Sequence, residues 1–136
     1  MTRMSFDNMS TLLIDEFPEL RERYDNEREW WGNEEPGQHV VFGDIFTPHL
    51  VKLLRDGTDA VQLERGFTFI ERLLTHDDIR VQEVAVVTVL EHLQGKPDLL
   101  NLAAPYLGPN SRKALKDLAQ FWEEIKTPHP SSPTRH

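Results

Sequence analysis

A chain of 136 residues has the size of a single domain, and its composition, 38% hydrophobic and 28% charged, is that of an ordinary globular protein. Cysteine is absent, which excludes disulfides, thiolate zinc sites and cysteine nucleophiles and fits a reducing, cytoplasmic compartment. The formal net charge is −8 and no stretch approaches the ~20 apolar residues of a membrane span, so we expect neither nucleic acid nor a membrane as a partner.

The N-terminal part of the chain has the pattern of a helix. Ser5 is a competent N-cap, and apolar residues from Phe6 to Tyr24 recur at three- and four-residue intervals, which lines one helical face. Pro18 interrupts this pattern because it cannot donate to the helical hydrogen-bond ladder. We therefore expect a kink or a new helix at Pro18.

Acidic residues are concentrated in the segment from residue 15 to residue 35, which carries a formal charge of −6. Three arginines are outnumbered by nine acids, namely Asp15, Glu16, Glu19, Glu22, Asp25, Glu27, Glu29, Glu34 and Glu35. Such a surface repels phosphate and attracts a basic protein. The segment is either a solvated helical face or a docking surface.

Two adjacent tryptophans, Trp30 and Trp31, lie within this acidic segment. Neighbouring side chains on a helix point about 100° apart, so the two rings are not expected to share one core. One interpretation is that Trp31 packs inward while Trp30 lies flat over a surface seam. The other is an aromatic anchor inside an acidic rim, which is how a binding hot spot for a basic partner is built.

The next stretch begins with a loop at residues 32–37, which is rich in turn-forming residues. The segment from His39 to Phe42 is ambiguous: it fits a short strand or an extended segment, and we expect it to pack on the core rather than form an exposed edge. Asp44 is then predicted to cap a helix that carries Pro48 in its first turn and ends at Gly57.

The middle of the chain contains two further predicted helices. Asp59 begins the first, and Gly66 inside it costs ~1 kcal/mol relative to alanine, which the close approach of another helix would explain. The second covers residues 79–94, with Asp77 or Asp78 as its cap and a Gly-Pro stop. Its run from residue 84 to residue 90 has strand propensity, but sixteen residues between two caps favour a helix. Since apolar residues circle it, we expect it to be central and buried on all sides, with Val87 in the core.

The C-terminal part is predicted to contain a short helix from Pro97 to about Pro105 or Gly108 and a final helix capped by Ser111. The expected buried stripe of that final helix is Leu115, Leu118, Ala119, Trp122 and Ile125. From Thr127 onward, proline and small polar residues predict a disordered tail over 127–136, which leaves a single domain over 1–126.

Three very short connections, at residues 56–58, 75–77 and 95–96, require antiparallel neighbours. The predicted fold is therefore all-α, with about five or six helices in stacked antiparallel hairpins, as a HEAT-like α-solenoid or a compact helical bundle. Residues 78–85 and 89–93, Asp-Ile-Arg-Val-Gln-Glu-Val-Ala and Val-Leu-Glu-His-Leu, resemble the second helix of a HEAT-type repeat.

No pattern in the chain predicts catalysis. The motifs of zinc peptidases, serine hydrolases, phosphate-binding loops and dinucleotide-binding folds are missing, and the six histidines form no helical pair. The densest cluster, His76-Asp77-Asp78, is interpreted as a loop that ends in a helix cap. We accordingly expect no catalytic residues, no metal site and no cofactor.

In size, acidity and lack of cysteine and catalytic motifs, the chain resembles the small immunity proteins that bacteria keep beside polymorphic or contact-dependent toxins. The resemblance implies binding and neutralisation of a toxin domain, often a basic nuclease, by a monomer or homodimer. The docking residues would be Glu27, Glu29, Trp30, Trp31, Glu34, Glu35 and Asp44. A general adaptor or regulatory subunit is the alternative function, and a metal- or carboxylate-dependent hydrolase is a third.

Overall fold

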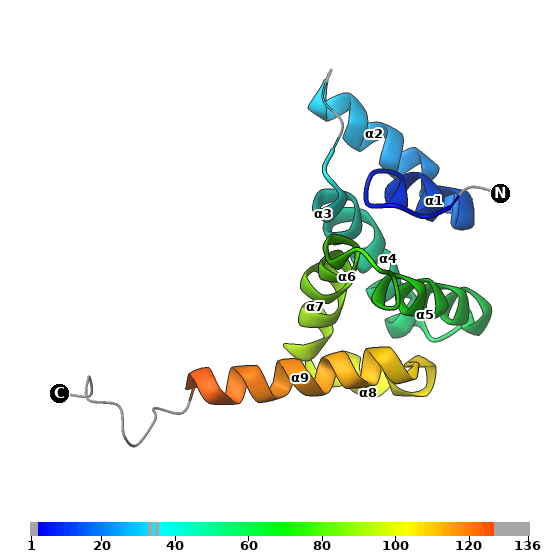
Figure 1. Ribbon diagram of the computed structural model, residues 1–136. Helices are drawn as coiled ribbons and strands as arrows, with labels where there is room; N and C mark the ends of the chain where they lie inside the picture. Colours follow the sequence, from blue (N-terminus) through cyan, green and yellow to red (C-terminus); the bar gives the residue numbers. More distant parts are fainter. Residues whose placement is uncertain (1–2, 33, 35, 127–136) are drawn as a thin grey trace.

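The computed structural model describes residues 3–32, 34 and 36–126, and these residues form an all-α fold with no strand, as predicted (Figure 1). Seven continuous helices are present in this described part of the chain rather than five or six. They are α1 (Met9–Glu16), α2 (Arg21–Trp31), α3–η2–α4 (Gln38–Val41, Phe42–Phe46, Thr47–Asp56), α5 (Ala60–Leu74), α6–η3–α7 (Ile79–Val84, Ala85–Leu90, Glu91–Gln94), α8 (Pro97–Ala103) and α9 (Pro109–Lys126). The predicted tail at residues 127–136 lies outside the described residues.

The extra helix results from the break before Pro18. A 3₁₀ turn, Pro18–Leu20, starts at this proline and leads into α2, so the expected interruption is a new helix. The beginning of α1 was predicted wrongly. The Ser5 N–H donates to Asn8 Oδ1 at 2.7 Å in a preceding turn, and α1 begins only at Met9.

Residues 38–56 form one helix, which corrects the prediction of a strand or extended segment at His39 and of a cap at Asp44. Asp44 lies inside η2, a π turn that precedes Pro48. Because Pro48 has no N–H, the Asp44 carbonyl loses its helical donor, and Arg23 Nη2 of α2 donates to it instead at 3.0 Å. The helix ends at Gly57, whose φ of 65° is the left-handed conformation expected of a C-cap glycine.

The helix over residues 79–94 is central, as predicted, because it contacts α5, η2, α8 and α9. It contains a second π turn, η3, which packs against η2, and Thr47 Oγ1 donates to the Thr88 carbonyl at 2.8 Å. Burial on all sides was a wrong prediction. Val84 is fully buried, whereas Val87 is 48% exposed because no described element covers that side of η3.

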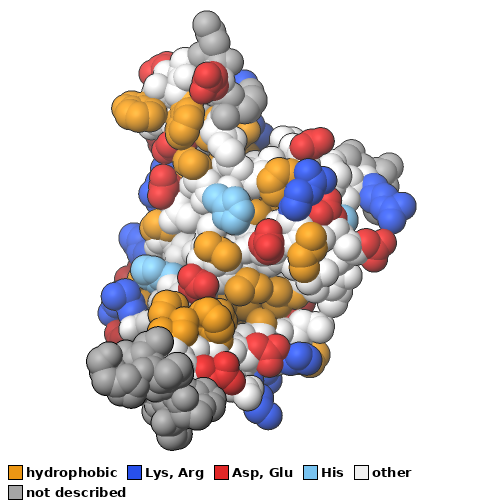
Figure 2. Space-filling view, turned by 60° about the vertical axis from the view of Figure 1, so that its left-hand side comes forward, with side chains coloured by type: hydrophobic (Ala, Val, Ile, Leu, Met, Phe, Trp, Pro, Cys, Tyr) orange, Lys and Arg blue, Asp and Glu red, His pale blue; other side chains and the backbone are white. Residues whose placement is uncertain are grey.

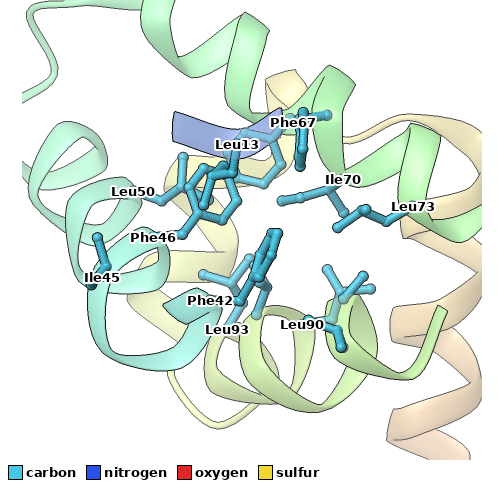
Figure 3. Packing of buried hydrophobic residues seen from close by; sticks show 14 of the residues in the cluster. Leu13, Phe42, Ile45, Phe46, Leu50, Phe67, Ile70, Leu73, Leu90 and Leu93 are labelled. Atoms are coloured by element: carbon cyan, nitrogen blue, oxygen red, sulfur yellow. The ribbon is translucent and has the colours of Figure 1, made fainter. Parts of the chain in front are cut away.

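One hydrophobic cluster extends from α1 to α9. In Figure 3, Phe42 and Phe46 point from η2 into the centre of this core, and both rings lie 6.2 Å from that of Phe69 on α5. Gly66 allows α4 to approach α5, since a Cβ atom there would lie 2.7 Å from Leu50 Cδ2. The close approach inferred from the sequence is therefore confirmed.

The final helix, α9, ends at Lys126 as predicted, but its beginning and part of its buried face were predicted wrongly. It begins at Pro109, and its first N–H groups are capped by the Glu71 carboxylate of α5 rather than by Ser111. Leu115 and Leu118 are buried as expected, but Ala119, Trp122 and Ile125 are exposed. Ala119 and Trp122 line an open groove beside α7 and α8, and the C-terminal part of α9 projects beyond the other helices (Figure 1).

Candidate partner-binding surface

A hollow of ≈ 590 Å³ lies between α2 and the helix formed by α3 and η2. We call it the tryptophan hollow; its lining residues are Arg23, Asn26, Glu27, Trp30, Trp31, Val40 and Asp44. Five of these belong to α2, at successive spacings of three, one, three and one residues, so they share one broad helical face. The other two, Val40 and Asp44, are one turn apart on the opposite wall.

The two tryptophans are held together at the end of α2. Their ring centroids are 5.8 Å apart in an edge-to-face arrangement, with an interplanar angle of 71°. Trp31 is half-buried and its Nε1–H donates to Glu27 Oε2 at 2.9 Å, whereas Trp30 is 79% exposed. Trp30 is therefore not part of the core, and its ring contacts that of Trp31.

The structure brings together four of the seven residues predicted to bind a partner: Glu27, Trp30, Trp31 and Asp44. Glu29 and Glu34 are exposed but do not line the hollow, and Glu35 lies outside the described residues. In Figure 2, hydrophobic and acidic side chains stand side by side at the upper end of the molecule, where α2 ends.

The acidic segment divides into a paired part and an unpaired part. Asp15 lies 3.8 Å from Arg21, Glu16 lies 3.4 Å from Arg72 and Glu19 lies 3.4 Å from His49. The contacts with Arg72 and His49 tie the beginning of the segment to the body. Within the described part of the chain, the α2 carboxylates of Glu22, Asp25 and Glu29 make no ion pair, and they lie on the side of α2 that faces away from the hollow. Among the described residues, the negative groups of the hollow itself are Glu27 and Asp44.

Sequence reasoning missed a second groove, of ≈ 490 Å³, where the two π turns meet. Its lining residues are Gly43, Thr47, Pro48, Val51, Lys52, Arg55, Asp56, Thr88 and His92. The cations on its rim are already paired, Lys52 with Asp56 at 3.0 Å and Arg55 with Asp98 at 3.2 Å. Pro48 inside a helical segment was the one signal in the sequence that an irregular turn was present here.

The carboxyl groups with shifted pKa values serve as helix caps. Hydrogen bonds from Gln62 hold the pKa of Asp59 below its ordinary value, and those from Arg80 do the same for the pKa of Asp78. Both are the caps predicted from the sequence. Among the described residues, no group of three or more histidine and acidic side chains is arranged to hold a metal ion. No helix in this part of the chain is both long and apolar enough to cross a bilayer.

Fold and surface together define an all-α domain with an exposed tryptophan in an acidic hollow. The chain belongs to the family described as a domain of unknown function, DUF7674, which it matches over residues 10–123. That match includes every residue that lines the tryptophan hollow. Comparison with curated proteins gave no match, and neither did comparison with solved structures.

Proposed function

We propose that this chain is a cytoplasmic protein-binding domain that takes a basic protein as its partner, and that it acts as an immunity protein that neutralises a bacterial toxin domain. The observation that carries the proposal is the 79% exposure of Trp30 at a hollow whose lining includes the carboxylates of Glu27 and Asp44. An exposed tryptophan costs solubility without stabilising the fold, whereas at an interface tryptophan is among the residues that contribute most to affinity.

The charge pattern supports a basic partner. Acidic side chains around an aromatic anchor accelerate encounter with a positive surface, and the buried aromatic ring then slows dissociation. Toxin nucleases bind phosphate through basic clefts. An acidic surface of this kind would bind in such a cleft and exclude the nucleic acid from it. Inhibition would require no chemistry from the bound domain.

The test is a pull-down of a basic protein encoded beside this chain, followed by an assay of that protein's nuclease activity. We expect a stoichiometric complex and loss of activity with the natural chain. A variant with lysine in place of Glu27, Glu29, Glu34 and Glu35 should be retained much more weakly at physiological salt. The matched control reverses four exposed acids on other faces, Glu64, Glu83, Glu123 and Glu124, and so changes the net charge equally.

Two outcomes would contradict the proposal. If the partner retained the first variant as well as the natural chain, the acidic surface around Trp30 would be merely solvated. Equal weakening by both variants would show that only net charge matters. A complex with a basic protein that is not a toxin would instead support an adaptor role.

A further inference from the structure

The tryptophan hollow combines an exposed indole, a carboxylate on each wall and one aliphatic side chain, Val40, beside Asp44. Trp30 projects into solvent, and its ring makes an edge-to-face contact with that of Trp31. Trp31 in turn donates a hydrogen bond to Glu27. These contacts favour one arrangement of the aromatic pair before any ligand arrives, which reduces the entropy lost on binding.

Among the described residues, Arg23 is the cation that lines the hollow, and its guanidinium is already bonded across it to the backbone of the opposite wall. The Arg23 Nη2 group donates to the Asp44 carbonyl, which needs a donor because Pro48 supplies no N–H. Arg23 therefore serves the fold of η2. The carboxylates of Glu27 and Asp44 remain on opposite walls, so the lining has two negative groups against one positive group. This charge disfavours an anionic ligand and favours a cationic one.

From these observations we infer that the tryptophan hollow is a socket for one arginine side chain of the basic partner, an inference that rests on the proposed function. A planar guanidinium stacks on an indole face and donates paired hydrogen bonds to a carboxylate. Trp30 offers the face, Glu27 and Asp44 offer the carboxylates, and Val40 offers an apolar contact for the methylene stem. The volume of ≈ 590 Å³ falls within the ~300–1,000 Å³ of ligand pockets and admits a side chain carried on its backbone.

Lysine fits this socket less well than arginine. Its ammonium group is a compact, strongly hydrated charge that neither stacks on an indole nor donates two parallel hydrogen bonds to one carboxylate. The inference therefore predicts a preference for the guanidinium group at equal charge. It also predicts that removal of the charge from the same planar shape abolishes binding.

The experiment is a titration of the ¹⁵N-labelled full chain with N-acetyl-arginine methylamide, followed by the indole N–H signals in two-dimensional NMR spectra. The chain has three tryptophans, so Trp122 on α9 is an internal reference. We expect saturable shifts for Trp30 and Trp31 and none for Trp122. The citrulline analogue, which keeps the shape without the charge, should cause no shift, and the lysine analogue should bind several-fold more weakly.

Two variants test the lining. Glu27→Gln should weaken the binding of the arginine amide by roughly tenfold, as expected for loss of a charge-assisted hydrogen bond, and Trp30→Ala should abolish it. Both side chains are solvent-accessible, so an unchanged far-ultraviolet circular dichroism spectrum should accompany each change. Equal shifts with citrulline or lysine, or no shift with arginine, would overturn the inference.

Failure of the socket and failure of the proposed function give different results. If reversal of the four acids weakens binding of a basic partner while the arginine amide does not shift the Trp30 indole signal, the socket is wrong and the function stands. If the amide binds as described while the four reversals leave binding of the genuine partner unchanged, the socket stands and the function is wrong.

Discussion

The cap on α9 is formed by a side chain from another helix, which makes its removal a direct test of the tertiary fold. The Glu71 carboxylate on α5 accepts from the Asn110 N–H at 3.3 Å, from the Asn110 side-chain amide at 3.0 Å and from the Ser111 N–H at 2.7 Å. Removing a helix cap costs ~0.5–2 kcal/mol. The Ser111 N–H belongs to a fully buried residue, so its loss of a partner places the expected cost of Glu71→Ala at about 1.5–2 kcal/mol.

The effect should depend on pH in a defined direction. Burial of the Glu71 carboxyl favours its neutral form, but the hydrogen bonds from Asn110 and Ser111 outweigh burial and lower the pKa from the ordinary value of 4.5. The ionised cap therefore contributes fully above about pH 4.5, and its contribution is lost as the pH falls through the folded-state pKa. We expect the difference between the natural chain and Glu71→Ala to shrink as the solution is acidified.

The assay is urea unfolding followed by circular dichroism. At pH 7 the Glu71→Ala midpoint should fall by roughly 1 M, given a typical slope of ~1–3 kcal/mol per molar urea. The control is Glu64→Ala, an exposed residue of the same helix that should cost less than ~0.5 kcal/mol. Equal losses from the two variants, or a Glu71→Ala effect that is unchanged in acid, would refute the reasoning.

A second residue reports on the same cap. A Cβ atom at Gly108 would lie 2.4 Å from Glu71 Cδ, so Gly108→Ala should displace the carboxylate. It should therefore cost clearly less in a chain that already carries Glu71→Ala than in the natural chain. Additive costs would show that Gly108 acts independently of the cap.

The remaining predictions concern the core and the tail. Val84→Asp should abolish folding because it buries an unpaired carboxylate, while Val87→Asp, on the exposed side of the same helix, should cost less than about 1 kcal/mol; thermal unfolding of the two compares them directly. Gly66→Ala should destabilise the chain by about 1–3 kcal/mol in urea, since its methyl group would overlap Leu50 and overpacking outweighs the ~1 kcal/mol gained in helix propensity. Deletion of residues 127–136 should change the unfolding free energy by less than about 1 kcal/mol, as their composition offers no packed face.

Each of these predictions has an outcome that contradicts it. Loss of folding in Val87→Asp would show that η3 is covered on both sides. A more stable Gly66→Ala would mean that Leu50 moves aside at little cost. A larger loss on deletion of the tail would mean that the tail docks on the body.

Features that depend on local chemistry were predictable from the sequence. The aspartate caps at Asp59 and Asp78, the C-cap glycine at Gly57 and the new helix at Pro18 all involve partners within a few residues. The close approach at Gly66 was inferred because a glycine inside a helix carries a cost that needs a compensating contact.

Features that depend on distant partners were not predictable. The α9 cap comes from Glu71, forty residues away from Ser111, and the donor to the Asp44 carbonyl comes from Arg23 on another helix. Amphipathic periodicity also records which face is apolar without recording where the neighbouring helices end. Trp122 is therefore apolar in pattern yet exposed in the fold.

The candidate site was only partly predictable for the same reason. Trp30, Trp31 and Glu27 were identified from composition and spacing along one helix. Their arrangement around a hollow also depends on Asp44, which was predicted both as a helix cap and as a docking residue. It is not a cap, because it lies inside η2, but it does line the opposite wall of the hollow. The α2 wall of the hollow was thus predicted from the sequence, whereas the position of the opposite wall was not.

Stopped-flow kinetics with the purified partner at two salt concentrations tests the central claim most directly. Reversal of Glu27, Glu29, Glu34 and Glu35 to lysine should slow association and flatten its salt dependence, with dissociation changed less. Trp30→Ala should instead accelerate dissociation about thirtyfold, which corresponds to a loss of binding free energy on the order of 2 kcal/mol. The dissociation rate of the Trp122→Ala variant should equal that of the natural chain. The thermal stability of Trp30→Ala should also be unchanged. The account would be contradicted if Trp30→Ala dissociated at the natural rate and the four charge reversals left the association rate unchanged.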